Sequence, residues 1–211
     1  STTTTIANIG IQAGNSLNSS ITQNTVSVEN AASTVPVAIS LETGFVSSSV
    51  TRNNITKALA TNTGGYGGRG IRVGTGTASS ALTIANNFIS GINGTNWSSF
   101  SNASSMGIAI GMIGASSTIT TTAGGINLYY NSVNMTGTYS STTACLTTAL
   151  YVGSGASALD IRNNIFVNSL NNTGTGSSSK AYSIYSAAAN TAFSTINYND
   201  YYVSGTQAVL G

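Results

Sequence analysis

The side chains that could carry out chemistry are few in this chain. Its carboxylates are Glu29, Glu42, Asp160 and Asp200, and it has no histidine. Glycoside hydrolysis would need two carboxylates at a fixed separation, and a calcium-dependent lyase would need several acidic oxygens on one face. The four acids instead fall in different segments of the chain. We therefore expect no catalytic residue and no enzyme.

The residue types also argue against metal and cofactor sites. Without histidine, neither a Ser–His triad nor histidine ligation of a metal is available. Cys145 is the only cysteine, so there is no soft-metal site and no internal disulfide, and we expect a buried thiol. Asp160 and Arg162 are expected to point outward from one strand as an ion pair. We predict no metal and no cofactor.

Charge is too sparse to recruit a charged partner. Charged residues make up 5% of the chain, against about 25% in a typical soluble domain. Arg69 and Arg72 come nearest to a basic patch, and two charges are too few to displace counterions from phosphates. No apolar run approaches the roughly 20 residues that cross a bilayer. We expect no nucleic-acid partner and no membrane span.

One motif recurs along the chain: an aliphatic residue, two variable residues, Asn, one variable residue and another apolar residue. Ile21–Asn24–Val26 is its first copy and Ile196–Asn199–Tyr201 its last. The intervals between the asparagines are about 29, 34, 44, 33 and 35 residues, a range that indicates a solenoid or array. The six asparagines are Asn24, Asn53, Asn87, Asn131, Asn164 and Asn199.

A second motif follows each of the first five asparagines. Its order is small, apolar, any, apolar, as in residues 70–73 and 149–152. Alternation with a period of two predicts short strands with one buried face, and nothing in the chain shows a helical period. The stretches between these segments consist of Gly, Ser, Thr and Asn, which are turn and loop residues.

These repeats predict an all-β fold, a parallel β-helix of about six coils over residues 20–211, with coils about 4.8 Å apart. Residues 1–19 are expected to form an extended segment, either an inter-subunit strand or a strand of the preceding coil. An antiparallel β-sandwich or jelly roll is the alternative. It would also give short strands with frequent turns, but it would not explain an Asn in a constant frame.

The constant Asn suggests a physical role at a corner between strands. We expect it to adopt the left-handed conformation there, which Asn tolerates better than other residues with a side chain. Stacked in register, the six side chains are expected to hydrogen-bond along the corner as an amide ladder.

Residues 125–133, 159–168 and 197–202 resemble a repetitive region of very large secreted Bacteroidota proteins. The resemblance covers the chain from about residue 80 to its end. It implies a right-handed parallel β-helix and export to the cell surface or medium by the type nine secretion route. It implies no activity. Because the sorting domain expected of that route is not in the sequence, we interpret the chain as a fragment or a processed subunit.

Two sets of outward side chains suggest binding. Tyr129, Tyr130 and Tyr198 could stack on sugar rings through their apolar faces. Thr22, Thr51 and Thr83 could order water as an ice-binding surface does, although the set is expected to be out of frame by one position. The tyrosine set is also what strand propensity alone would produce.

We therefore expect a non-enzymatic, extracellular structural or adhesive protein, a stalk segment or fibre subunit on a bacterial surface. Neither end resembles a cap, so we expect self-association end to end or pairing with the rest of a longer chain. A glycan-binding or ice-binding module is the second hypothesis, with surface glycans as partners. A polysaccharide lyase or hydrolase of β-helical fold is the third.

Overall fold

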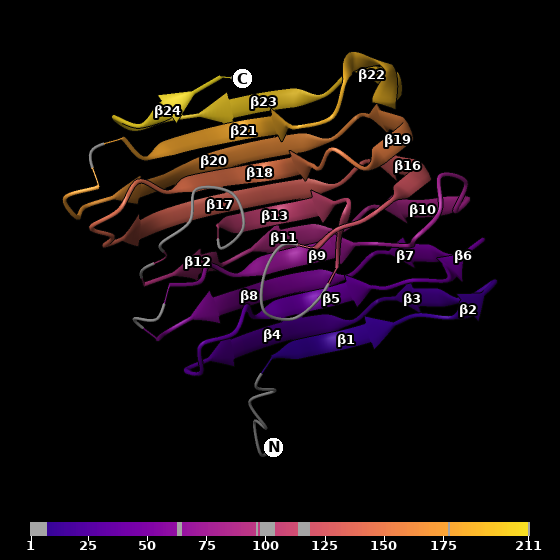
Figure 1. Cartoon of the computed structure of the whole chain (residues 1–211), viewed down its shortest axis with the longest axis horizontal. Coiled ribbons are helices and arrows are strands. Elements are labelled where there is room, and N and C mark those ends of the chain that lie inside the picture. The colour runs from indigo at the N-terminus through magenta and orange to yellow at the C-terminus, as the bar shows by residue number, and fades with distance from the viewer. Residues whose placement is uncertain are drawn as a thin grey trace.

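The computed structural model describes residues 8–62, 65–95, 97, 104–113, 119–176 and 178–210. Within these ranges the chain is all-β, with one short 3-10 turn, η1 (Asn190–Ala192), and no α-helix. Three large sheets contain most of the strands, and the chain ascends through them from its N-terminus to its C-terminus (Figure 1). No helix in the described part of the chain is long and apolar enough to cross a membrane.

Each large sheet is named here after its first strand. The β1 sheet contains β1 (Ile9–Ala13), β5 (Val37–Leu41), β9 (Arg69–Val73), β13 (Ser105–Ile110), β18 (Leu146–Val152), β21 (Lys180–Ser186) and β24 (Ala208–Val209). The β3 sheet contains β3 (Ser20–Thr22), β7 (Ser49–Thr51), β10 (Leu82–Ala85), β16 (Ala123–Tyr129), β19 (Ala156–Arg162) and β22 (Phe193–Asn197). The β4 sheet contains β4 (Thr25–Asn30), β8 (Asn54–Ala60), β11 (Phe88–Ser90), β12 (Ile92–Gly94), β17 (Ser132–Tyr139), β20 (Ile165–Asn172) and β23 (Asp200–Val203).

The chain visits the three sheets in a fixed rotation. It passes from the β1 sheet to the β3 sheet, then to the β4 sheet, and returns to the β1 sheet one strand further along. One such circuit is called a repeat below. Every strand pair within the three large sheets is parallel, and each joins equivalent strands of neighbouring repeats.

Antiparallel pairing is confined, among the described residues, to β14 (Met112–Ile113) and β15 (Ile119–Thr120). A second short pair, β2 (Ser16–Leu17) with β6 (Phe45–Val46), is parallel. The antiparallel sandwich or jelly roll weighed as an alternative is therefore wrong, because such folds are built from antiparallel strands.

The apolar residues that flank each repeated Asn stack on one another across the repeats. Those before the Asn lie in register in the β3 sheet, and those after it lie in register in the β4 sheet. Nearly all are buried in one continuous core. The two columns are Ile21, Val50, Ile84, Leu128, Ile161 and Ile196, and Val26, Ile55, Ile89, Val133, Phe166 and Tyr201.

The small residue of the second motif has a packing reason. A Cβ added to Gly70 would lie 2.6 Å from Cγ2 of Ile89, and one added to Gly107 would collide with Cγ1 of Val133. Ile89 and Val133 belong to the β4 sheet, so these glycines face its large side chains across the core. The β1 sheet can approach the β4 sheet closely only where its own side chain is small.

The expectation of one buried face per strand is wrong for the β1 sheet. In β5, β9, β13 and β18 every residue is buried, on both faces. The outward residues Met106, Ala109 and Tyr151 pack with Met112 of β14 in a second apolar cluster, and Tyr185 lies against it. The longest repeat, which contains the β14–β15 pair, thus supplies a cover for the outer face of this sheet.

Part of the expected N-terminal segment, residues 1–7, lies outside the described residues. Of the remainder, β1 pairs in parallel with β5, and β2 pairs with β6. Residues 9–13 and 16–17 therefore lie beside the second repeat as strands of the first one.

Candidate functional site

The six repeated asparagines form an unbroken chain of side-chain hydrogen bonds along one corner, between the β3 and β4 sheets. In Asn53, the backbone N–H and Nδ2 both donate to Oδ1 of Asn87, at 3.0 and 2.9 Å. Nδ2 of Asn53 also donates to the carbonyl of Ile21 in the repeat before, at 3.0 Å. The same donation to the next Oδ1 is made by Asn24, Asn53, Asn87, Asn131 and Asn164.

The left-handed residue of each corner is not the one that the sequence suggested. It is the residue directly before the ladder Asn, as in Arg52 (φ 57°) before Asn53 and Asn86 (φ 56°) before Asn87. The ladder Asn points inward to its hydrogen-bond partners, while the residue before it turns the chain and exposes its side chain. The six corner residues are Gln23, Arg52, Asn86, Tyr130, Asn163 and Tyr198.

Three of the four carboxylates are each engaged by a basic side chain. Lys57 lies 3.0 Å from Glu29, Arg72 lies 2.6 Å from Glu42, and Arg162 lies 2.5 Å from Asp160. The three pairs are well separated: one joins β4 and β8, one joins β9 to the residue after β5, and one lies within β19. Within the described ranges no group of three or more His, Cys, Asp or Glu residues could hold a metal ion.

Asp160 and Arg162 occur together with Tyr129 on the outer face of the β3 sheet. Arg162 donates to both oxygens of Asp160, from Nε at 2.7 Å and from Nη2 at 2.5 Å. The Tyr129 hydroxyl donates to Asp160 at 2.6 Å, and the Arg162 guanidinium lies 5.1 Å from the centre of the Tyr129 ring. Desolvation alone would raise the pKa of Asp160, but hydrogen bonds from Arg162 and Tyr129 outweigh it and hold that pKa below its usual value. The three side chains are therefore mutually fixed.

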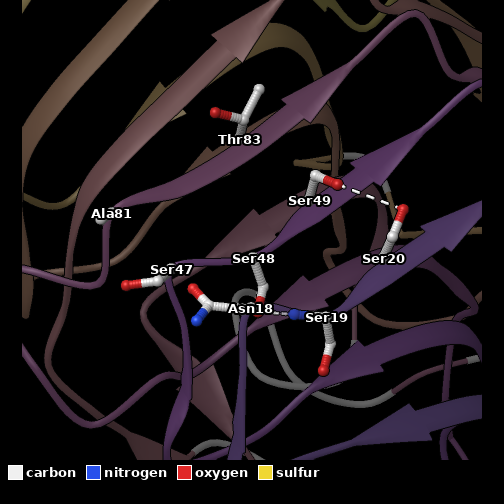
Figure 2. Close-up of a pocket in the computed structure, with 8 residues that line it drawn as sticks. All are labelled: Asn18, Ser19, Ser20, Ser47, Ser48, Ser49, Ala81 and Thr83. Atoms are coloured by element: carbon white, nitrogen blue, oxygen red, sulfur yellow. Dashed lines mark hydrogen bonds between the residues drawn. The ribbon is translucent and has the colours of Figure 1, made fainter.

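A shallow polar hollow of about 440 Å³ lies at the N-terminal end of the same face (Figure 2). Oγ of Ser49 donates to Oγ of Ser20 at 3.3 Å, and the backbone N–H of Ser19 donates to Oγ of Ser48 at 2.9 Å. Its lining includes neither a carboxylate nor a basic group, so its polar groups are hydroxyls and amides. The lining residues are Asn18, Ser19, Ser20, Ser47, Ser48, Ser49, Ala81 and Thr83.

The three threonines singled out in the sequence fall in two columns. Thr22 pairs with Thr51, and their hydroxyls are 3.2 Å apart. Thr83 pairs with Ser49, so it stands in the adjacent column, two residues away from the first. The expected offset of one position is therefore wrong, and an offset of two places all three on one face.

The tyrosines singled out in the sequence separate into two places. Tyr129 is half-buried and engaged by Asp160 and Arg162. Tyr130 and Tyr198 both occupy left-handed corner positions, with φ of 55° and 54°, and their side chains are 59% and 79% exposed. They share a corner column two repeats apart, with Asn163 between them.

The two arginines nearest to a basic patch are buried and do not form a surface for anions. Arg72 donates to Ser40 and to Glu42, at 2.7 and 2.6 Å. Burial, with a contribution from the neighbouring Arg72, lowers the pKa of Arg69 to about 9. The sequence could not reveal this burial, because it depends on packing between repeats: β14 of the next repeat contacts β9, the strand that carries both arginines. The one feature of the sequence that hints at an extra segment here is the long interval between Asn87 and Asn131, which contains β14 and β15.

Cys145 is a buried thiol, as expected. It lies 3.1 Å from the carbonyl of Trp97, and burial raises its pKa. Trp97 stacks on Tyr139 with ring centroids 4.3 Å apart. This part of the molecule is packed core.

Comparison with known proteins gives no family or relative to place beside this geometry. No family model, no curated protein and no solved structure matches the chain.

Proposed function

We propose that this chain is a right-handed parallel β-helix with a structural role, a rod segment that assembles end to end in an extracellular fibre or stalk. The proposal includes secretion to a bacterial surface, by analogy with the repetitive Bacteroidota proteins that the sequence resembles. It assigns no catalytic residue.

The rotation of the chain through three parallel sheets supports the β-helical part of the proposal. A chain that leaves one sheet, passes through two others and returns beside its starting strand winds around a common core. Connections between parallel strands are right-handed in about 98% of cases, which supports the right-handed sense.

The polarity of the Asn ladder is the observation that carries end-to-end assembly. Each ladder Asn donates toward the C-terminal repeat and accepts from the N-terminal one. Among the described residues, Oδ1 of Asn24 therefore accepts no ladder bond, and the N–H of Asn199 donates none. A second copy that places its Asn24 above Asn199 would continue the ladder in the same direction.

The apolar columns support the same stacking. At the C-terminal repeat the core opens in a hollow of about 540 Å³ lined by Ile184, Ile196, Tyr201 and Leu210. Ile196 is 40% exposed and Leu210 64% exposed, although Ile196 continues the column of buried Ile161. The next members of these columns in a second copy would be Ile21 and Val26. Burying apolar surface stabilises the contact by roughly 25 cal/mol per Å².

The sheet edges are also complementary. β24 pairs with Ala181 and Tyr182 of β21, so Val209 holds the place that Ile9 of a second copy would otherwise take. The rest of β21, residues 183–186, has no strand partner on that side among the described residues. A parallel strand can be added only by a chain that runs in the same direction, and the first repeat of a second copy does so.

Electron microscopy of the purified chain at several concentrations tests the proposal. Filaments with an axial repeat near 30 Å, about six strand spacings, are the expected result. Ile196→Glu should abolish filaments while the circular dichroism spectrum stays that of a β-protein, because a charge would enter the stacking surface. Thr83→Glu, on the lateral face, is the matched control and should assemble normally. Dispersed monomers at every concentration would overturn end-to-end assembly.

A further inference from the structure

The six residues that directly precede the ladder asparagines form a corner column along the molecule. All of them must adopt the left-handed backbone conformation, which two of them, both tyrosines, do not favour. All six positions have φ between 53° and 60°. Asn, which occupies two of them, adopts this region readily, whereas a bulky side chain there is disfavoured. Tyr130 and Tyr198 occupy it nevertheless. Residues held in unfavourable backbone conformations cluster at ligand sites, where the strain accompanies function.

Neither tyrosine is buried in the core, and neither makes a specific side-chain contact within the described part of the chain. The side chains are 59% and 79% exposed, and no ring contact or side-chain hydrogen bond joins either of them to another described residue. Tyr151 and Tyr185, in contrast, stack on each other with centroids 5.9 Å apart. The fold therefore gives no reason for Tyr at either corner position.

The two tyrosines occupy corner positions that lie on one line along the molecule. The backbone N–H of Tyr130 donates to the carbonyl of Arg162, the residue before Asn163, so these corners are adjacent repeats. Tyr198 is one repeat further on, since Arg162 pairs with Asn197. Two strand spacings place the corners about 10 Å apart. One extended ligand can therefore contact both rings.

Polar groups lie between and beside the rings. The exposed side chain of Asn163 stands between them and offers both a donor and an acceptor. The Arg162 side chain is 41% exposed, and its guanidinium is held in place by Asp160 and Tyr129. Because Asp160 neutralises Arg162, the strip has apolar faces and hydrogen-bonding groups without net charge.

We propose that Tyr130, Asn163 and Tyr198 form a binding strip for a neutral oligosaccharide. Its sugar rings stack on the two tyrosines through their C–H faces, and its hydroxyls bond to Asn163 and Arg162. A nucleic acid would stack equally well on aromatic rings, but it needs clustered basic residues that the strip lacks. The proposal depends on the stacking of repeats within one chain and not on assembly of several chains.

The test begins with a glycan array probed with the purified chain at a concentration at which it is dispersed. The best neutral oligosaccharide is then titrated by calorimetry. Tyr130→Ala and Tyr198→Ala should each weaken binding about 2- to 10-fold, and the double variant should abolish it. Tyr202→Ala is the matched control, because Tyr202 is 55% exposed but lies on the β4 sheet. Its affinity should be unchanged.

A further variant separates ligand binding from a structural role. Tyr198→Asn should raise the melting temperature, because Asn suits the left-handed corner, and should still weaken binding. If no neutral glycan binds, or if the double variant binds as the parent does, the proposal is overturned. Filament formation, measured separately by microscopy, should be the same in all of these variants, so failure of assembly and failure of sugar binding are distinguishable.

Discussion

Asn87 donates twice to a single atom of Asn131: its backbone N–H lies 3.1 Å and its Nδ2 2.9 Å from Oδ1. Asn131 in turn donates from Nδ2 to the carbonyl of Ile84, at 2.9 Å, and to Oδ1 of Asn164, at 3.0 Å. A side-chain amide is the only group of this size that accepts and donates in this way. Both asparagines are buried, so every one of these groups needs its partner.

Asn131→Ala is expected to lower the free energy of unfolding by about 2–4 kcal/mol, because it leaves buried donors of Asn87 without their acceptor. Urea unfolding followed by circular dichroism measures the change. Asn24→Ala is the control: Oδ1 of Asn24 accepts no ladder bond from a described residue, and its loss should cost about 1 kcal/mol or less. Equal costs at the two positions would show that the ladder does not act as described.

Asn131→Asp tests the donor half of the same relationship. An ionised carboxylate could still accept from Asn87, but it would face the carbonyl of Ile84 and Oδ1 of Asn164 without a proton to donate. We expect this variant to be less stable than Asn131→Ala at pH 7 and to regain stability as the pH falls toward 4, where the acid is protonated. The midpoint of urea unfolding, measured for this variant at pH 7 and pH 4, tests the expectation. A pH-independent midpoint contradicts the expectation.

A left-handed residue outside the corner column, Ala158 within β19, predicts a stabilising substitution. Ala158 has a φ of 48° and an exposed side chain. Ala158→Gly should stabilise the protein by about 0.5–1 kcal/mol, because Gly adopts this conformation without steric cost. At this chain length that is a rise in melting temperature of roughly 1–4 °C. The neighbouring Ser157, whose φ is not in this region, is the control, and Ser157→Gly should lower the melting temperature instead.

The sequence predicts the stacked part of this molecule well and the corner geometry poorly. The ladder asparagines and their apolar neighbours recur in a constant frame, so their alignment follows from the repeat. The repeat does not tell which of two adjacent residues adopts the left-handed conformation at the corner. Pairs such as Asn86–Asn87 offer the left-handed conformation to both, and only the burial of Asn87 decides that the turn falls on Asn86.

The buried outer face of the β1 sheet was also beyond sequence reasoning. Period-two alternation assigns Arg72 and Tyr151 to an outward face, and this is where they lie. It cannot reveal that a segment from another repeat covers that face. The candidate sugar-binding strip could be predicted in part, since the sequence pattern identifies tyrosines at outward positions. That Tyr130 and Tyr198 share a corner while Tyr129 lies on the sheet follows only from the register.

The small positions of the β1 sheet predict a clash that can be relieved in part. Gly107→Ala should cost about 1–3 kcal/mol, because the new Cβ collides with Cγ1 of Val133 and with the carbonyl of Ala149. Removing the Val133 methyls in a Gly107→Ala/Val133→Ala variant should cost less than the sum of the two single changes. A double-mutant cycle in urea measures the coupling. Additive costs would mean that the two sheets do not meet at this point.

Alkaline pH is expected to destabilise the fold through its buried tyrosines. Burial raises the pKa of both Tyr139 and Tyr151 above the usual value of 10.0. Above pH 10 the unfolded chain therefore loses these protons first, so stability is lost as the pH rises through this range. The lowered pKa of Arg69 acts with the opposite sign, so the tyrosine effect must be isolated.

Tyr139→Phe, which cannot ionise, should lose less stability than the parent between pH 9 and 11 in urea unfolding. With no histidine in the chain, both proteins should have a nearly flat profile from about pH 6 to 8. Parallel alkaline slopes for the two proteins would rule out Tyr139 as a cause.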